Sequence, residues 1–251
     1  MSKRKQVFLH AAIAALLILG AAICAGAQNN SNTATKQNTR EPVAKEKEAA
    51  PPMKAAPGED LHYSYEFTKS DFFIRHIVIK HDATGHGEIS FERQGDLEPI
   101  VEPLQLSESA SSRIKGLWEV LRFLDSNASY QAEKQFPHLG TMKLWMRQGT
   151  RERAAEFNWT QDQNMRALVD EYRRAANQSI FVFDISVARQ NQPLDSPKIL
   201  SRLDTYLKRN EISDPRQLIP LLRDLNTDER LPLMARNHAG RILKMLEKEN
   251  Q

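Results

Sequence analysis

The alternation of apolar and polar residues that begins at Leu61 does more than any other feature to set the fold. From 61 to 68, every second residue is aromatic or aliphatic, which is typical of a strand with one buried face. The preceding residues, 28–60, hold no aromatic residue and almost no large aliphatic one, so they cannot bury enough apolar surface to offset their conformational entropy. The sequence therefore predicts a disordered linker over 28–60 and a folded region that starts at 61.

Strand patterns recur further along the chain, and most of them form hairpins. Glycines in the polar loop 82–87, and Gly149 in a later loop, suit hairpin turns because glycine accepts positive φ without steric cost. The segment 97–106 suits only the edge of a sheet, because Pro99 and Pro103 each remove a backbone donor. The other predicted strands are 73–81, 88–93, 141–148, 151–159 and the strongly apolar 180–187.

Two helices are predicted between these strands. Ser107 can cap the first, in which apolar residues recur at helical spacing from 114 to 124. Thr160 and Gln163 match a capping box, in which each side chain accepts from the other's backbone N–H, and so mark the start of the second. Strands separated by two helices indicate an α+β domain over 61–192, an antiparallel sheet with the two helices packed on one face.

From 193 to 251 the pattern is helical, which predicts a small all-helical C-terminal module. Its three helices are predicted to start at Ser196-Pro197, Asp214-Pro215 and Thr227-Asp228. On the last of them, one apolar face is expected to carry Leu231, Met234, Ala235, Ile242 and Leu246.

Part of this module resembles a known repeat. The similarity is to one HEAT-type helical hairpin and covers residues 214–246, DPRQLIPLLRDLNTDERLPLMARNHAGRILKML. The first helix carries a Leu-Ile-Pro-Leu-Leu run, a short Asp-containing turn follows, and the second helix carries an arginine and small alanines. HEAT arrays gain their stability from several stacked units, and one unit is present here, so the hairpin is expected to pack against the preceding helix or the α+β domain. Because HEAT-type surfaces usually bind proteins, the resemblance implies an adaptor or scaffold.

The first 27 residues look like an export signal. Three basic residues at 3–5 precede an apolar segment from 7 to 25, and Ala25-Gly26-Ala27 gives the small-x-small pattern at which signal peptidase cleaves. The 21 residues from Val7 to Ala27 are also long enough to span a bilayer, so an uncleaved membrane anchor is the alternative.

Cleavage at this site makes Gln28 the first residue of the exported protein. N-terminal sequencing of the exported form is therefore expected to begin at Gln28. Recovery of an intact segment from Met1 to Ala27 in the membrane fraction would contradict cleavage and support the anchor.

The net charge of the chain comes from this export segment. The formal charge is +3, from 35 Lys and Arg against 32 Asp and Glu, and residues 1–27 hold three of the cations and no acid. The rest of the chain has 32 of each, which argues against nucleic acid as a partner. The only cysteine, Cys24, also lies in this segment, so the remainder folds without disulfides. Ile23 precedes it where a bacterial lipobox has a small residue, which disfavours lipidation.

The sequence carries no motif that points to catalysis, a cofactor or a metal. The nearest approach to a metal cluster is His76, His81 and His86, together with Asp82. His76 and His81 are an odd number of residues apart on one predicted strand and so point to opposite faces. Only His81, Asp82 and His86 could converge, across the loop, whereas zinc normally takes three or four well-placed ligands. Two glutamate pairs are expected in water on strand surfaces, Glu88 with Glu92 and Glu152 with Glu156. No nucleophile elbow or phosphate-binding loop occurs. We therefore predict no catalytic residue, no cofactor and no metal.

Two sets of residues are candidate binding surfaces. Trp145 shares a predicted strand face with Lys143 and Arg147, and a tryptophan flanked by cations suits a binding contact. Arg236 and His238 on the predicted last helix are the second set.

Together these patterns predict an exported scaffold rather than an enzyme. The short chain, the lack of disulfides and the low-complexity linker favour the bacterial envelope, with an envelope protein as the partner and contact with the membrane only through the N-terminal segment. The alternative is a hydrolase that acts on envelope polymers, with its site on the hairpins. A deep cleft with converging His, Asp or Glu side chains would favour the hydrolase, and a shallow apolar groove on the last helices would favour the scaffold.

Overall fold

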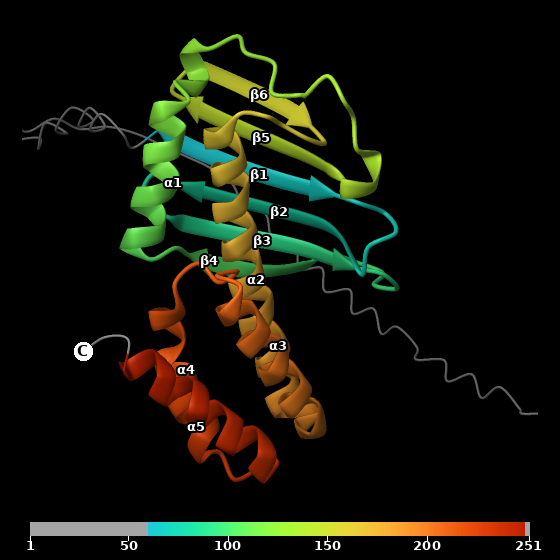
Figure 1. The fold of residues 1–251 in the computed structure, drawn as a ribbon, viewed down its shortest axis with the longest axis vertical. Helices are drawn as coiled ribbons and strands as arrows, with labels where there is room; N and C mark the ends of the chain where they lie inside the picture. Colours follow the sequence, from blue (N-terminus) through green and yellow to red (C-terminus); the bar gives the residue numbers. More distant parts are fainter. Residues whose placement is uncertain (1–59, 249–251) are drawn as a thin grey trace, which may run out of the picture. The chain divides into compact units, whose positions relative to one another are not determined.

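The computed structural model describes residues 60–248, in which an antiparallel sheet carries helices on one face (Figure 1). The six strands lie in the order β4-β3-β2-β1-β5-β6. They are β1 (Leu61–Thr68), β2 (Ile74–Asp82), β3 (His86–Arg93), β4 (Ile100–Gln105), β5 (Thr141–Gln148) and β6 (Arg151–Phe157). The helices are α1 (Glu108–Val120), α2 (Gln163–Asn191), α3 (Ser196–Lys208), α4 (Ile219–Thr227) and α5 (Leu233–Lys248). The predicted α+β class is confirmed. The predicted export segment, and the predicted linker up to residue 59, lie outside the described residues.

Strand β1 occupies the middle of the sheet and shows the predicted alternation. Leu61, Tyr63 and Tyr65 are buried beneath the helices, whereas His62 and Ser64 lie half-buried on the open face. β1 pairs with β2 on one side and with β5 on the other, so the apolar face of the first strand lies over the centre of the core.

Strand β4 is an edge strand, as predicted, although it is shorter than 97–106. The Leu106 N–H donates to the Gly85 carbonyl across the β3–β4 pair, whereas the Gln105 carbonyl accepts from Gln217 Nε2 (3.4 Å), which lies outside the sheet. Because bonding positions alternate in an antiparallel pair, Pro103 has the same orientation as Gln105 and faces the free edge. The missing N–H of Pro103 therefore costs the sheet no ladder bond.

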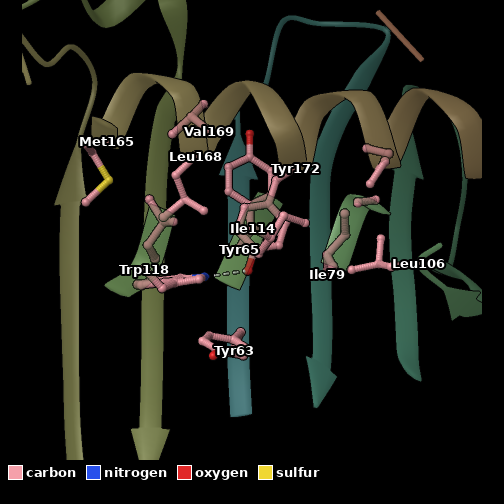
Figure 2. Close-up of a cluster of buried hydrophobic side chains, with 14 of the residues drawn as sticks. Tyr63, Tyr65, Ile79, Leu106, Ile114, Trp118, Met165, Leu168, Val169 and Tyr172 are labelled. Carbon is pink, nitrogen blue, oxygen red and sulfur yellow. Dashed lines mark hydrogen bonds between the residues drawn. The ribbon is translucent and has the colours of Figure 1, made fainter. Parts of the chain in front are cut away.

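The main core lies between the sheet and helices α1 and α2 (Figure 2). At its centre, Trp118 Nε1 donates to Tyr172 Oη (3.0 Å), and the Tyr172 ring stacks on Tyr65 with ring centroids 5.2 Å apart. His81 Nε2 lies 3.0 Å from the same hydroxyl, and His81 Nδ1 lies 2.7 Å from the Asp82 carbonyl.

The proton positions in this network follow from its acceptors. The Asp82 carbonyl can only accept, so Nδ1 of His81 carries the proton and Nε2 accepts from the Tyr172 hydroxyl. Burial lowers the pKa of His81 and raises the pKa of Tyr172, which keeps both side chains neutral. The chain of bonds from Trp118 to Asp82 thus satisfies every polar group that it buries.

The predicted strand at 180–187 is wrong, because these residues lie in the C-terminal half of α2. Phe181, Ile185 and Ala188 are buried at helical spacing. Ile180 packs in the main core, whereas Phe181 and Ile185 belong to a second cluster with α3, α4 and α5. The segment is strongly apolar because two cores contact it from different sides, and such a short run has no periodicity that separates a strand from a helix.

Two predicted helix starts are also wrong. Asp162, rather than Thr160, caps α2, since the Asp162 carboxylate accepts from the Met165 N–H (2.9 Å). The last helix begins at Leu233 instead of 227–228, because Thr227 ends α4. The Asp228 carboxylate instead pairs with Arg230, in the loop between α4 and α5, and with Arg189 of α2. These two guanidinium groups keep the pKa of Asp228 far below its usual range.

The second core is helical. α5 contributes Ala235, Ala239, Ile242 and Leu246, each at most 3% exposed. Met234, which was expected on this face, is 70% exposed because it precedes Ala235 by one residue and so lies about 100° around the helix. None of the helices within 60–248 has both the length and the apolarity that a membrane crossing requires.

Carboxylates on α2 tie this helix to its surroundings. Glu171, which is buried, pairs with Arg113 of α1 (3.0 Å) and with Arg174 of its own helix (2.6 Å). Asp184 pairs with Arg93 of β3 and Arg202 of α3. α2 is therefore joined both to the sheet side and to the C-terminal helices.

Candidate functional site

Trp145, Lys143 and Arg147 lie together on β5, on the open face of the sheet. Trp145 is half-buried and the two cations are exposed, with the Arg147 guanidinium 5.8 Å from the centre of the Trp145 ring. The cross-strand neighbours of Trp145 are the small residues Ser64 and Ala154.

The charges on this open face are mixed rather than concentrated. Lys143 stands between Glu66 and Glu156 on the neighbouring strands, and Arg147 stands next to Glu152. Each cation of the predicted surface therefore has a carboxylate beside it, so the face holds no strong excess of one sign.

Arg236 and His238 do not join the Trp145 surface. Both are half-buried on α5, which packs against α3 and α4. Partial burial and the nearby Arg241 lower the pKa of His238. The structure thus separates the two predicted binding sets.

The histidines of β2 lie on opposite faces of the sheet, and His76 contacts two glutamates. His76 lies on the open face between Glu66 (3.0 Å) and Glu92 (3.3 Å), whereas His81 is buried beneath the helices, so the prediction that they point to opposite faces is confirmed. Glu152 and Glu156 are exposed. Within the described residues, no three His, Cys, Asp or Glu side chains lie where they could hold one metal ion.

A groove that sequence reasoning missed lies where the free edge of β4 meets α2. It has a volume of about 610 Å³ and is completed by the short 3₁₀ helix η4 (Pro215–Leu218). β4 contributes Glu102, Pro103 and Gln105, and α2 contributes one face from Gln178 to Gln190. We call it the β4–α2 groove.

The lining of the β4–α2 groove is almost free of charge. Glu102 is the one charged residue among its twelve described lining residues, although 27% of the chain is charged. Val182 and Val187 of α2 are 37% and 39% exposed there, and the remaining lining is mostly glutamine and serine. The groove thus offers apolar side chains together with neutral groups that both donate and accept hydrogen bonds.

Amide side chains fix one end of the groove. Gln178 Nε2 donates to Gln217 Oε1 (2.8 Å), and Gln178 Oε1 accepts from the Asp214 N–H (2.8 Å). Gln217 in turn donates to the Gln105 carbonyl (3.4 Å). These bonds join α2, η4 and β4, so the three walls of the groove are held together.

The sequence pattern that points to this groove is the spacing of the valines in 180–187, a segment that was predicted as a strand but is helical. With 180–187 as a strand, the valines at 182 and 187 fall on opposite faces. In the observed helix, both lie on the stripe that lines the groove, together with Ser179, Phe183, Ser186 and Gln190.

No protein-family model matches this sequence, and no curated protein matches it significantly.

Proposed function

We propose that this chain is an exported, non-enzymatic scaffold protein of the bacterial envelope that binds an extended, uncharged segment of another protein in the β4–α2 groove. The observation that carries the proposal is the nearly uncharged lining of that groove in a highly charged chain. A volume of about 610 Å³ lies within the range of pockets that enclose small ligands or several residues of a peptide.

The polar groups of the groove match a polypeptide backbone. The Gln190 amide can both donate to a carbonyl and accept from an N–H, and the Gln178 and Gln217 amides, beyond the bonds described above, each keep a second N–H and a second oxygen lone pair. The free edge of β4 adds backbone groups, but Pro103 interrupts its donors. A bound segment would therefore be held by a few main-chain bonds and by apolar side chains against Val182 and Val187, rather than by a continuous strand pairing.

Other features support the same class of function. The N-terminal pattern predicts export, and the resemblance of 214–246 to a HEAT-type hairpin implies protein binding. A second, polar hollow of about 340 Å³ near the start of α1 is lined by residues such as Ser111, Ser112 and Lys115. Neither of these two hollows is lined by a histidine.

Selection of phage-displayed random decapeptides tests this proposal. The peptides enriched on the protein are expected to be poor in Asp and Glu, because Glu102 is the charged group of the groove. Val182→Asp should weaken the enriched peptides by at least about tenfold, equivalent to about 1.4 kcal/mol, since it places a charge against their apolar side chains.

The matched control is Val120→Asp, at a valine that is 63% exposed on α1 outside the groove. This variant is expected to bind the same peptides as the unaltered protein does. Equal binding by the Val182→Asp and Val120→Asp variants, or the absence of any enriched peptide, would show that the groove is not a peptide site.

A further inference from the structure

Three asparagines in the described part of the chain begin the pattern Asn-x-Ser/Thr, which is the acceptor pattern of N-glycosylation in exported proteins. They belong to Asn127-Ala128-Ser129, Asn158-Trp159-Thr160 and Asn177-Gln178-Ser179. The sugar is joined to the asparagine amide, and the transferase also binds the hydroxyl two residues later. A folded protein therefore accepts sugar only where both groups are exposed and free of other bonds.

The Asn158 site is closed in the folded protein. The Asn158 side-chain oxygen accepts from the Phe136 N–H (3.0 Å). Thr160 is 5% exposed, and its hydroxyl accepts from the Asp162 N–H (3.2 Å). Transfer of sugar to Asn158 would therefore require the segment before α2 to unfold locally.

The Asn177 site is closed for a different reason. Asn177 lies within α2, where its side-chain N–H donates to the Glu211 carbonyl (3.1 Å). Two positions along a helix correspond to a rotation of about 200°, so Ser179 points away from Asn177. One binding surface of a transferase cannot contact both side chains while this part of α2 stays helical.

The Asn127 site, in contrast, is open. Asn127, Ala128 and Ser129 are all exposed, in an irregular segment of the loop between α1 and β5. Within the described residues, neither the Asn127 side-chain amide nor the Ser129 hydroxyl has a hydrogen-bond partner. Because the segment is not helical, the rotation that separates the two side chains at the Asn177 site does not apply here.

The ends of this loop are fixed, so Asn127 is presented to solvent. Phe123 and Tyr130 are buried on either side of it, at 1% and 6% exposed. Arg153 of β6 donates to the carbonyls of Phe123 (2.6 Å) and Ala128 (2.7 Å). These bonds hold the loop beside the β6 edge of the sheet (Figure 1).

We propose that Asn127 is an N-glycosylation site of the folded, exported protein, with a lipid-diphosphate-linked oligosaccharide as the sugar donor. The inference rests on the export that is part of the proposed function. In the transfer, Asn127 Nδ2 attacks the anomeric carbon of the sugar, and a C–N bond forms. The C–O bond to the diphosphate breaks, its electron pair leaves with the lipid diphosphate, and the proton that the amide loses passes to a base of the transferase.

A glycan at Asn127 leaves the β4–α2 groove accessible. The loop lies beside β6, whereas the groove lies at β4, the opposite edge of the sheet. Five strand spacings, about 24 Å, separate the two edges. Glycosylation and peptide binding are therefore compatible in one molecule.

Enzymatic transfer to the purified, folded full chain tests the inference. Bacterial oligosaccharyltransferases also require an acidic residue two positions before the asparagine, and Asn127 and Asn158 both have one. Free peptides that cover 123–131 and 154–162 are therefore matched acceptors and are expected to be glycosylated at similar rates. In the folded chain, Asn127 is expected to be glycosylated at least about tenfold faster than Asn158, which local unfolding must first release.

Substitutions in the loop check that this pattern accepts the sugar. Asn127→Gln and Ser129→Ala are each expected to abolish modification of the loop, whereas Ser129→Thr, which keeps the hydroxyl, is expected to retain it. Both positions are exposed, so these changes leave the core intact. Peptide mapping by mass spectrometry locates the sugar. No sugar at Asn127 of the folded chain, or equal rates at Asn127 and Asn158, would overturn the inference.

Protein recovered from the cells that naturally make it separates this inference from the proposed function. Its N-terminus is expected at Gln28, and Asn127 is expected to carry sugar. An N-terminus at Gln28 with an unmodified Asn127 would overturn the glycosylation site and leave the export prediction intact. Sugar on Asn127, together with no decapeptide enriched on the protein, would support the site and contradict the scaffold function.

Discussion

Trp118→Ala is expected to lower the free energy of unfolding by about 3–5 kcal/mol, as for other large aromatic side chains removed from a core. Trp118 is 1% exposed and packs against Tyr63 and Phe123, with ring centroids 5.4 Å and 4.7 Å apart. Its removal leaves a large cavity beneath the sheet. It also takes away the donor to the Tyr172 hydroxyl, which is buried.

Urea denaturation followed by circular dichroism measures this change, with Val120→Ala as the control. Val120 lies two residues further along the same helix but is 63% exposed, so its truncation is expected to change stability by less than about 0.5 kcal/mol. Similar losses in the two variants would contradict the packing of α1 shown by the structure.

Leu222→Ala is expected to cost about 2–5 kcal/mol. Leu222 is fully buried in the helical core, between α4 and its neighbours. Met234→Ala, on α5, is the control, because Met234 is 70% exposed and lies outside the helical core. A loss of stability no larger than that of the control would mean that α4 does not pack as described.

The same variant tests whether the two cores unfold together. α2 buries Ile180 in the sheet core and Phe181 in the helical core, one residue later. All the tryptophans, at 118, 145 and 159, precede α2 and report on the sheet side. If α2 couples the cores, Leu222→Ala should shift the tryptophan fluorescence transition to lower urea by the same free energy as the circular dichroism transition. An unchanged fluorescence transition would show that the cores unfold independently.

Local patterns predicted most of the sheet but not the way α2 is shared. Strand β1 was predictable because one of its faces meets a core and the other meets water, which produces strict alternation. Ser107 was identified as a cap because the cap bond is local, from Ala110 N–H to the serine hydroxyl. The strand at 180–187 was predicted wrongly because burial from two sides removes the periodicity on which such predictions depend.

The candidate site was harder to foresee than the fold. Lys143, Trp145 and Arg147 were placed on one face by the period of a strand alone. The β4–α2 groove, in contrast, combines a strand edge, a helix face and a 3₁₀ helix, and its β4 and η4 walls lie more than a hundred residues apart in sequence. Such long-range juxtaposition has no local signature in a single sequence.

Pro103 has a further consequence for how molecules of this protein meet one another. A strand from another molecule that tried to extend the sheet at β4 would find no donor at Pro103, in the middle of the strand. At the opposite edge, Arg153 of β6 donates to the carbonyls of Phe123 (2.6 Å) and Ala128 (2.7 Å), so the loop that follows α1 lies beside that strand. Pro103 therefore weakens, at the β4 edge, the intermolecular strand pairing with which fibrous aggregation begins.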